Sequence, residues 1–432
     1  MENDDAININ QLNDDCLVYI LEFLPLEDRL CAELVCKRWY CICNLLWQKF
    51  QKFDITDDCY ATGENNEDYN MKLLKQVFSR CAQYITVLNI SNVLKVDQII
   101  LLDFDPHLRN SKKKNKEDEK DWQEVKEISL RCENLESLTL GSMFKIDDTY
   151  LSTLLNRNNG IRSFYLVTNN ELKIQNKFRI PSKNLETLII DCYSFHIDSL
   201  DFQALNESNK LKNLMLTVAF DDKDDLVLHN FKPKNLEQLH LNSSIRCVPR
   251  IISELADPSR LKVVSVISCD GSQIENLVNA LIHYCKNLEG LRIEGDFSDF
   301  QLRIISNSLP KLVCLDIGFT SAGTDEEMKH VNKNLKCLSA PSNFLTDQGI
   351  SNLLKRAEIL EKLDLCDSQY LSNNAVNILI DAMEVRIKQN NLTPLEVGVE
   401  YAIDIGNTPN PCPLLKFTIG PMNMMYNNYI NL

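Results

Sequence analysis

The chain has 432 residues, of which 44% are hydrophobic and 25% are charged, and its formal net charge is −15. These proportions are typical of a folded, soluble protein, and the negative charge argues against a general nucleic-acid binder, which needs basic surface to neutralise phosphates. No stretch approaches the roughly 18 uninterrupted apolar residues of a membrane helix.

The chain starts with an acidic and polar segment, residues 1–10, which lacks the basic start and the apolar run of a secretory signal. We therefore expect a soluble intracellular protein that contacts no membrane and resides in the cytoplasm, the nucleus or both. Its 16 cysteines are then expected to be reduced thiols, because disulfides rarely persist in those compartments.

Residues 9–50 carry the pattern of three short helices. The apolar residues of the first helix recur at helical spacing, and they are Leu17, Ile20, Leu21 and Leu24. Pro25 predicts the end of this helix, because the residue before a proline avoids helical geometry. A second helix is predicted over Glu27–Arg38, since acids suit the positive start of a helix and bases suit its end. A third helix is predicted over Trp39–Leu46.

This stretch resembles the F-box. Three strings carry the resemblance, Leu12–Leu17, Ile20–Asp28 and Leu34–Trp39, and the Val-Cys-Lys-Arg-Trp run in the last is the most specific. Asn13 stands where the family usually has proline, and Leu21 where phenylalanine is common. So small a domain cannot bury much core, and its apolar surplus independently suggests a surface for a partner.

In the F-box family that partner is a Skp-family linker, which joins the protein to a cullin–RING ubiquitin ligase. The resemblance implies that the linker-binding positions are Leu12, Leu17, Ile20, Leu24, Pro25, Leu26, Leu34, Val35 and Trp39. An alternative is that the three helices only cap the end of the array that follows, because repeat arrays need capping.

A steady repeat fills most of the remaining chain. The phrase Leu-x-x-Leu-x-Leu, or a close variant, recurs every 23 to 27 residues, starting at Leu135, Ile161, Leu185, Leu211, Leu236, Leu261, Leu288, Leu312, Leu335 and Leu360. Leu-x-Leu has strand spacing, and the segments between phrases, such as Ile274–Ile282, have helical spacing. The pattern predicts an α/β leucine-rich-repeat solenoid, a horseshoe of about 12 or 13 repeats with a parallel sheet on its concave side. Strings such as Cys285-Lys-Asn-Leu288 resemble the cysteine-containing subclass of these repeats.

The ends of the array are less regular. Ile85–Ile90 predicts an earlier strand and Leu414–Ile419 a later one. We expect an F-box domain at 1–53, a linker at 54–70, a solenoid at 71–419 and a C-terminal tail at 420–432. A mobile insertion is expected at about 109–121, because its lysine-rich and acidic run cannot bury apolar area. Lys112–Lys116 could also be read as a nuclear-import signal, although a short solvated lysine cluster explains it as well.

Strand alternation sorts the residues beside the leucines onto the concave face. Interfaces favour aromatic, methionine and arginine anchors, so a substrate site is predicted there at Tyr165, Val167, Ile189 and Met215, assisted by His240 and Arg292. The alternatives are that the C-terminal tail covers some of these residues, or that they are ordinary half-buried sheet positions.

No motif for chemistry stands out. Cys31, Cys36, Cys41 and Cys43 lack the paired spacing of a structural zinc site. No phosphate-binding glycine loop, metalloprotease helix or nucleophile elbow occurs. We therefore expect a protein that is not an enzyme and uses no metal or cofactor. The predicted function is substrate recognition in a Skp–cullin–F-box ubiquitin ligase, with an unidentified protein as substrate. The alternative is a ligase-independent scaffold or inhibitor.

Overall fold

The structure is a computed structural model. It describes residues 9–55, 67–90, 125–141, 146–168, 180, 183–196, 200, 202–219, 231–242, 248–269, 271–295, 297–317, 323–340, 344–366, 368, 370–372, 374–399 and 412–419. The chain divides into two compact units, unit 1 (Met1–Leu185) and unit 2 (Glu186–Leu432). Within the described ranges, no helix is long and apolar enough to cross a membrane. The predicted insertion at 109–121, the lysine cluster Lys112–Lys116 and the predicted tail at 420–432 lie outside these ranges.

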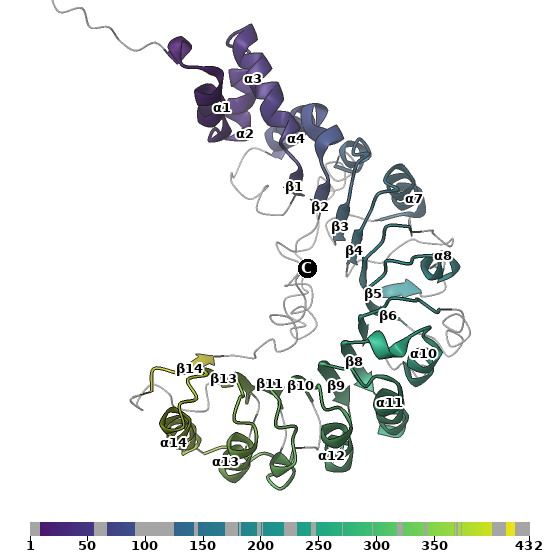
Figure 1. Ribbon diagram of the computed structural model, residues 1–432. Coiled ribbons are helices and arrows are strands. Elements are labelled where there is room, and N and C mark those ends of the chain that lie inside the picture. Colours follow the sequence, from purple (N-terminus) through teal and green to yellow (C-terminus); the bar gives the residue numbers. More distant parts are fainter. Residues whose placement is uncertain are drawn as a thin grey trace, which may run out of the picture. The chain divides into compact units, whose positions relative to one another are not determined.

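Unit 1 begins with three helices, α1 (Asp14–Glu22), α2 (Leu26–Ala32) and α3 (Lys37–Gln48), as Figure 1 shows. Asn13 caps α1, because its side-chain oxygen accepts a hydrogen bond from the N–H of Cys16 at 2.8 Å. Asn13, which stands where the F-box family usually has proline, therefore starts the helix through a side-chain hydrogen bond. Pro25 directly precedes α2, as expected for a residue whose fixed φ suits a helix start.

The second helix is shorter than predicted. It ends at Ala32, so Leu34 and Val35 lie in the turn before α3, and Lys37 and Arg38 begin α3 instead of closing α2. The prediction relied on the attraction between basic side chains and the negative end of a helix. That attraction is weak beside the specific contacts that hold Arg38.

Arg38 is held at the start of α3 by three hydrogen bonds. Its guanidinium donates to the Asp14 carboxylate at 2.8 Å, to the Asn10 carbonyl at 2.8 Å and to the Leu12 carbonyl at 2.5 Å. These bonds tie α3 to the segment that leads into α1. Charge-assisted hydrogen bonds of this kind are about twice as strong as neutral ones, so they decide the position of the residue.

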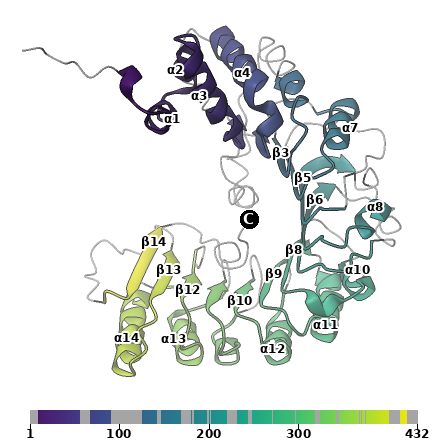
Figure 2. The same cartoon turned by 45° about the horizontal axis from the view of Figure 1, so that its top comes forward.

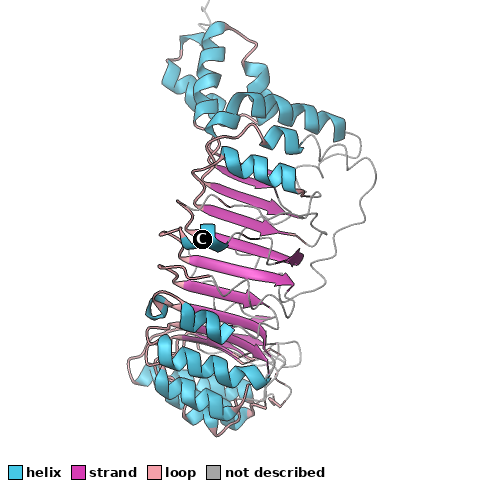
Figure 3. Ribbon diagram, turned by 90° about the vertical axis from the view of Figure 1, so that its right-hand side faces the viewer, coloured by secondary structure: helices cyan, strands magenta, loops and turns pink. Residues whose placement is uncertain are grey.

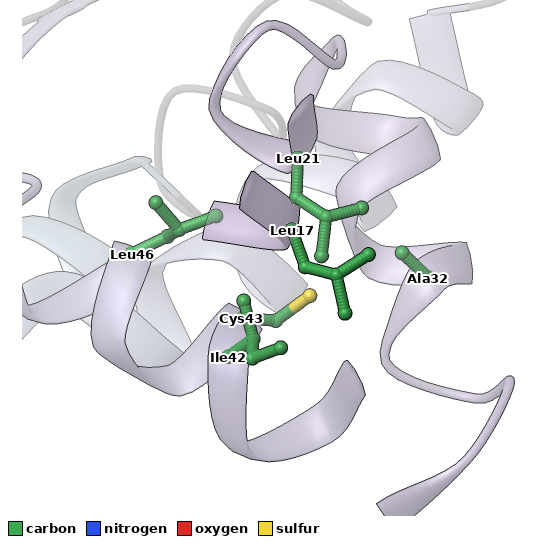
Figure 4. Close-up of a cluster of buried hydrophobic side chains, with 6 residues drawn as sticks. All are labelled: Leu17, Leu21, Ala32, Ile42, Cys43 and Leu46. Carbon is green, nitrogen blue, oxygen red and sulfur yellow. The ribbon is translucent and has the colours of Figure 1, made fainter. Parts of the chain in front are cut away.

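The three helices close on a small apolar core, shown in Figure 4. Its members are buried side chains from all three helices: Leu17, Leu21, Ala32, Ile42, Cys43 and Leu46. Half-buried residues pack against this cluster, and they are Leu12, Val18, Leu24 and Trp39. The predicted three-helix arrangement is confirmed.

A four-stranded parallel sheet completes unit 1. Its elements are β1 (Lys52–Ile55), α4 (Glu67–Cys81), β2 (Val87–Ile90), β3 (Ser137–Gly141), α7 (Asp148–Arg157) and β4 (Ser163–Val167). Each strand pairs in parallel with the next, and α4 packs against both α2 and α3. The segment predicted as a linker, 54–70, thus contains the end of β1 and the start of α4, and its residues 56–66 lie outside the described ranges.

Unit 2 continues the same architecture. Its strands are β5 (Thr187–His196), β6 (Asn213–Ala219), β7 (Gln238–Asn242), β8 (Val263–Cys269), β9 (Gly290–Gly295), β10 (Cys314–Asp316), β11 (Cys337–Ser339), β12 (Lys362–Asp364), β13 (Leu395–Val399) and β14 (Leu415–Ile419). Its helices are α8 (Phe202–Asn206), α10 (Val248–Glu254), α11 (Gly271–Tyr284), α12 (Asp299–Ser308), α13 (Asp347–Arg356) and α14 (Ala375–Lys388). The strands form one parallel ladder in chain order, with the helices on its outer side (Figure 2).

The leucine phrases form the core between sheet and helices. Leu315, Leu338 and Leu363 are paired across β10, β11 and β12, and each is fully buried. Figure 3 shows the parallel strands stacked in this way. Parallel strands that are covered on a face bury long apolar runs. The predicted leucine-rich-repeat solenoid is confirmed. Among the described residues between β10 and β11, a 3-10 turn, η6 (Glu327–Lys329), stands where a helix was expected.

In several repeats an asparagine directly precedes the first leucine of the phrase, as in Cys285-Lys-Asn-Leu288. The side chains of these asparagines link neighbouring repeats. The Asn287 side chain donates to the Ser259 carbonyl at 3.0 Å, and the Asn334 side chain donates to the Pro310 carbonyl at 3.1 Å. Each asparagine therefore satisfies a backbone carbonyl about one repeat earlier in the chain.

A second set of bonds between repeats lies at the edge of unit 2 where strands end and helices begin. Asp299 accepts from the N–H of Thr324 at 3.2 Å and from its hydroxyl at 2.5 Å. Asp325 accepts from the N–H and hydroxyl of Thr346, and Asp347 from those of Ser372. We call Asp299, Asp325 and Asp347 the edge aspartates.

Candidate protein-interaction surfaces

The N-terminal helices expose more large apolar side chains than their small core buries. The exposed residues are Tyr19, Ile20, Phe23, Leu34, Val35, Tyr40 and Leu45. Phe23 is 71% exposed and Leu34 is 84% exposed. The rings of Tyr19 and Phe23 stack edge to face, with centroids 4.9 Å apart. Exposed apolar patches are common at protein-binding sites, so these side chains are candidates for contact with a partner.

The nine predicted linker-binding residues fall into three groups. Ile20, Pro25, Leu34 and Val35 are exposed. Leu12, Leu24, Leu26 and Trp39 are half-buried. Leu17 is 0% exposed and lies in the centre of the core. Direct contact between Leu17 and a partner is therefore a wrong expectation, because a motif match does not distinguish a side chain that faces the partner from one that faces its own domain.

Four exposed residues were not predicted: Tyr19, Phe23, Tyr40 and Leu45. Tyr19 and Phe23 lie off the apolar face of the first helix, which carries Leu17, Leu21 and Leu24. A signal was present, because they are four residues apart and so share a second face of the same helix. Leu17 and Leu21 form the face of this helix that is buried in the core, while Tyr19 and Phe23 are left exposed.

Glu33 connects the helical domain to the rest of unit 1. Its carboxylate is buried and accepts two hydrogen bonds from Arg80 of α4, at 2.7 and 2.8 Å, and a short one from the indole N–H of Trp47. The Arg29 guanidinium lies over the Trp47 ring, 5.4 Å from its centroid. Side chains from α2, α3 and α4 thus meet at one buried charge, which fixes the helical domain against the first helix of the solenoid.

The four clustered cysteines have separate environments. Cys31, Cys36 and Cys41 are exposed, while Cys43 is buried and burial raises the pKa of its thiol to about 11. Cys43 is part of the apolar core, as expected for a cysteine that behaves as a small hydrophobe. Within the described ranges, no three His, Cys, Asp or Glu side chains come together as metal ligands.

The inner face of the sheet in unit 2 carries one continuous column of residues. The strand register places side by side Ile189, Met215, His240, Ser265, Arg292, Asp316, Ser339 and Asp364. All eight residues are buried.

The charged part of this column is tightly paired. Arg292 donates to Glu294 at 3.0 Å and lies 3.5 Å from the Asp316 carboxylate. Burial raises the pKa of Asp316 to about 6, against the opposing effect of Arg292. Burial also lowers the pKa of His240 to about 3, and Arg292 adds to that effect. His240 is therefore neutral at physiological pH.

The predicted substrate residues do not form an open surface. In unit 1 Tyr165 and Val167 lie on β4, and in unit 2 Ile189, Met215 and His240 lie on β5, β6 and β7, with Arg292 on β9. All six are at most 6% exposed. Their contact with a substrate stays a prediction, and their burial agrees with the alternative that they are ordinary sheet positions. Strand alternation identifies the face of a sheet, but the accessibility of that face depends on packing that no single strand encodes. The predicted covering segment, 420–432, lies outside the described ranges.

Unit 2 has a different exposed feature that was not predicted. Phe344 and Tyr370 are 52% and 56% exposed, and their rings stack with centroids 5.6 Å apart. Both residues follow a strand of the sheet, β11 and β12 respectively. The sequence signal is a repeated string, Phe344-Leu-Thr346 and Tyr370-Leu-Ser372.

Comparison with known proteins supports the reading of the first stretch. A family model described as F-box-like matches residues 9–51, and no curated protein matches the chain. Among solved structures, the chain is similar to one from the crystal structure of the yeast Rad7 and Elc1 complex, at 14% identity over 70% of this chain and 78% of that chain, with a TM-score of 0.42. A likeness of this strength carries no argument about this chain.

Proposed function

We propose that this chain, in which an F-box-like domain precedes a leucine-rich-repeat solenoid, is the substrate-recognition subunit of a Skp–cullin–F-box ubiquitin ligase. In this proposal the F-box-like domain binds a Skp-family linker and the solenoid binds a protein substrate. The protein itself is not an enzyme in this role. It raises the local concentration of substrate beside the subunits that transfer ubiquitin.

One observation carries the proposal. The F-box-like domain has a closed core and still exposes apolar side chains on α1, on the α2–α3 turn and on α3. Burial of such side chains by a partner is favourable by about 25 cal/mol per Å² of apolar surface. A domain that served only as a cap would need apolar surface toward the solenoid alone.

The contacts of Glu33 are compatible with the adaptor role. A ligase adaptor must hold the substrate at a defined position relative to the linker, and flexible attachment lowers the effective concentration of one end at the other. The buried Glu33 carboxylate joins α2 and α3 to α4 through Arg80 and Trp47. Such a joint favours a defined geometry between the F-box-like domain and the start of the sheet.

The same joint is the observation that favours the second candidate, a ligase-independent scaffold or inhibitor whose N-terminal helices cap the solenoid. Packing of α4 against α2 and α3 is what a cap requires. The two candidates differ in their partner, because a cap binds no Skp-family linker. Residence in the cytoplasm, the nucleus or both remains part of the proposal.

Reconstitution tests the ligase role. The full chain, a Skp-family linker, a cullin and its RING subunit are mixed and separated by size-exclusion chromatography with light scattering. The adaptor proposal expects all four to elute as one complex that loses this chain when the linker is left out. The scaffold candidate expects the chain to elute alone in both mixtures.

A further inference from the structure

Exposed aromatic side chains gather at one edge of unit 2. Phe344 and Tyr370 follow β11 and β12, and Phe300 lies in the first turn of α12. All three are more than half exposed. They share the edge where strands end and helices begin, because parallel strands all end on the same side of a sheet. This edge is therefore apolar at intervals along the solenoid.

The loops that carry Phe344 and Tyr370 are held by matching bonds. Thr346, two residues after Phe344, donates its N–H and its hydroxyl to Asp325 at 2.9 and 2.6 Å. Ser372, two residues after Tyr370, donates its N–H to Asp347 at 3.0 Å. Rings presented in a fixed position lose little conformational freedom when a partner binds, and aromatic side chains dominate the energetic centres of interfaces.

The charge around these rings is negative. The three edge aspartates lie at the starts of α12, η6 and α13. Two basic residues of α12 and η6 are paired with glutamates, Lys329 with Glu326 at 2.5 Å and Arg303 with Glu327. Arg303 also interacts electrostatically with Asp299, whereas Asp325 and Asp347 bind the residues that lie two positions after Phe344 and Tyr370, and the chain as a whole carries a net charge of −15.

We propose that the Phe344–Tyr370 pair is the contact point for a basic segment of the protein substrate, with an arginine or lysine side chain of that segment stacked on the rings. A cation over an aromatic ring is attracted to the face of the ring, and arginine stacks best. The nearby edge aspartates supply the complementary charge that steers and holds such a segment. An acidic or phosphorylated segment meets repulsion at the same place. That the bound protein is a ubiquitination substrate rests on the proposed ligase role. The contact between a basic segment and the Phe344–Tyr370 pair does not depend on that role.

Two short fluorescent peptides test the proposal, one rich in arginine and proline and one in which glutamate replaces every arginine. Anisotropy titrations use the full chain as wild type, as the F344S/Y370S double variant and as the control L392S, which removes an exposed apolar side chain away from the pair. The arginine peptide is expected to bind wild type and L392S equally, and the double variant about tenfold more weakly. Circular dichroism in urea is expected to give all three proteins the same unfolding midpoint.

Three results would overturn the proposal: equal binding of the arginine peptide to wild type and the double variant, preference of the wild type for the glutamate peptide, or no binding of either peptide. Linker binding by the same double variant separates this proposal from the ligase role. The pair lies in unit 2 and outside the F-box-like domain, so the double variant is expected to bind a Skp-family linker as wild type does. Failure of linker binding in the wild type would contradict the ligase role and leave the peptide result standing.

Discussion

The Asp325 carboxylate binds Thr346 of the following repeat through both of its oxygens. Oδ1 accepts the backbone N–H at 2.9 Å, and Oδ2 accepts the side-chain hydroxyl at 2.6 Å. Thr346 is also the N-cap of α13. One carboxylate thus fixes the start of the next helix, and Asp299 and Asp347 make the corresponding contacts with Thr324 and Ser372.

Replacement of Asp325 by alanine is expected to destabilise the solenoid by about 1–3 kcal/mol, because the substitution leaves two donors without their acceptor. Urea unfolding followed by circular dichroism measures the change. The neighbouring Glu326→Ala serves as control, since Glu326 is exposed and forms its ion pair with Lys329 on the surface. Equal unfolding midpoints for the Asp325 and Glu326 variants would contradict a structural role for the edge aspartates.

Glu33 is expected to couple energetically to Arg80. Removal of either partner leaves the other with an unmatched charge, and for Glu33 that charge is buried. We expect E33Q and R80Q each to lower the free energy of unfolding, with a coupling of about 1–3 kcal/mol in the double-mutant cycle. Hydrogen exchange of α4 provides a local readout, and unchanged exchange in E33Q would argue against a joint at this position.

Leu17 is expected to contribute to stability and Phe23 to linker binding. Leu17→Ala empties space in the centre of the helical core and should cost about 2–5 kcal/mol of stability. Phe23→Ala removes an exposed ring and should change stability little, while weakening linker binding. Thermal unfolding and linker titration of both variants separate the two roles. If Phe23→Ala unfolds as readily as Leu17→Ala, the division between core and surface drawn here is wrong.

Titration of Asp316 is expected to make the free energy of unfolding depend on pH. Its pKa is raised to about 6 in the folded protein by burial, and Arg292, Glu294 and Asp364 act on the same carboxyl. A raised pKa means that the folded state binds more protons than the unfolded state, so stability falls as pH rises from about 4 to 6. Relative to Asp316→Asn, the wild type should lose at most about 3 kcal/mol across that range.

His240 acts in the opposite direction, because its pKa is lowered to about 3 and acid therefore favours the unfolded state. The comparison with Asp316→Asn isolates the aspartate, since both proteins retain His240. Urea unfolding at a series of pH values provides the measurement. A difference between the two proteins that does not vary between pH 4 and pH 6 would show that Asp316 is not buried as described.

The repeat was predictable because the same physical demand recurs in every strand. The same register position is occupied by Leu315, Leu338 and Leu363, and all three are fully buried. The short leucine phrase is therefore enough to predict each strand. Helices such as α12 and α13 were predictable for the same reason.

Features that depend on distant contacts were not predictable. β1 is a short strand whose identity rests on pairing with β2, and Arg38 is placed by Asp14, 24 residues away. Met215 and Arg292 are buried, whereas alternation along a strand reports only which face they occupy. The Phe344–Tyr370 pair was hidden because the two rings meet only across neighbouring repeats.

The central claim is that the exposed apolar side chains of the F-box-like domain bind a Skp-family linker. Isothermal titration of the purified linker into the full chain tests it, with the F23D/L34D double variant and the matched L392D control. Phe23, Leu34 and Leu392 are all exposed, so none of the changes should unfold the protein, and circular dichroism checks this. We expect tight binding by wild type and L392D and a loss of at least about a hundredfold in F23D/L34D, because two charges would be buried without partners. No binding by the wild type, or equal binding by all three proteins, would contradict the claim.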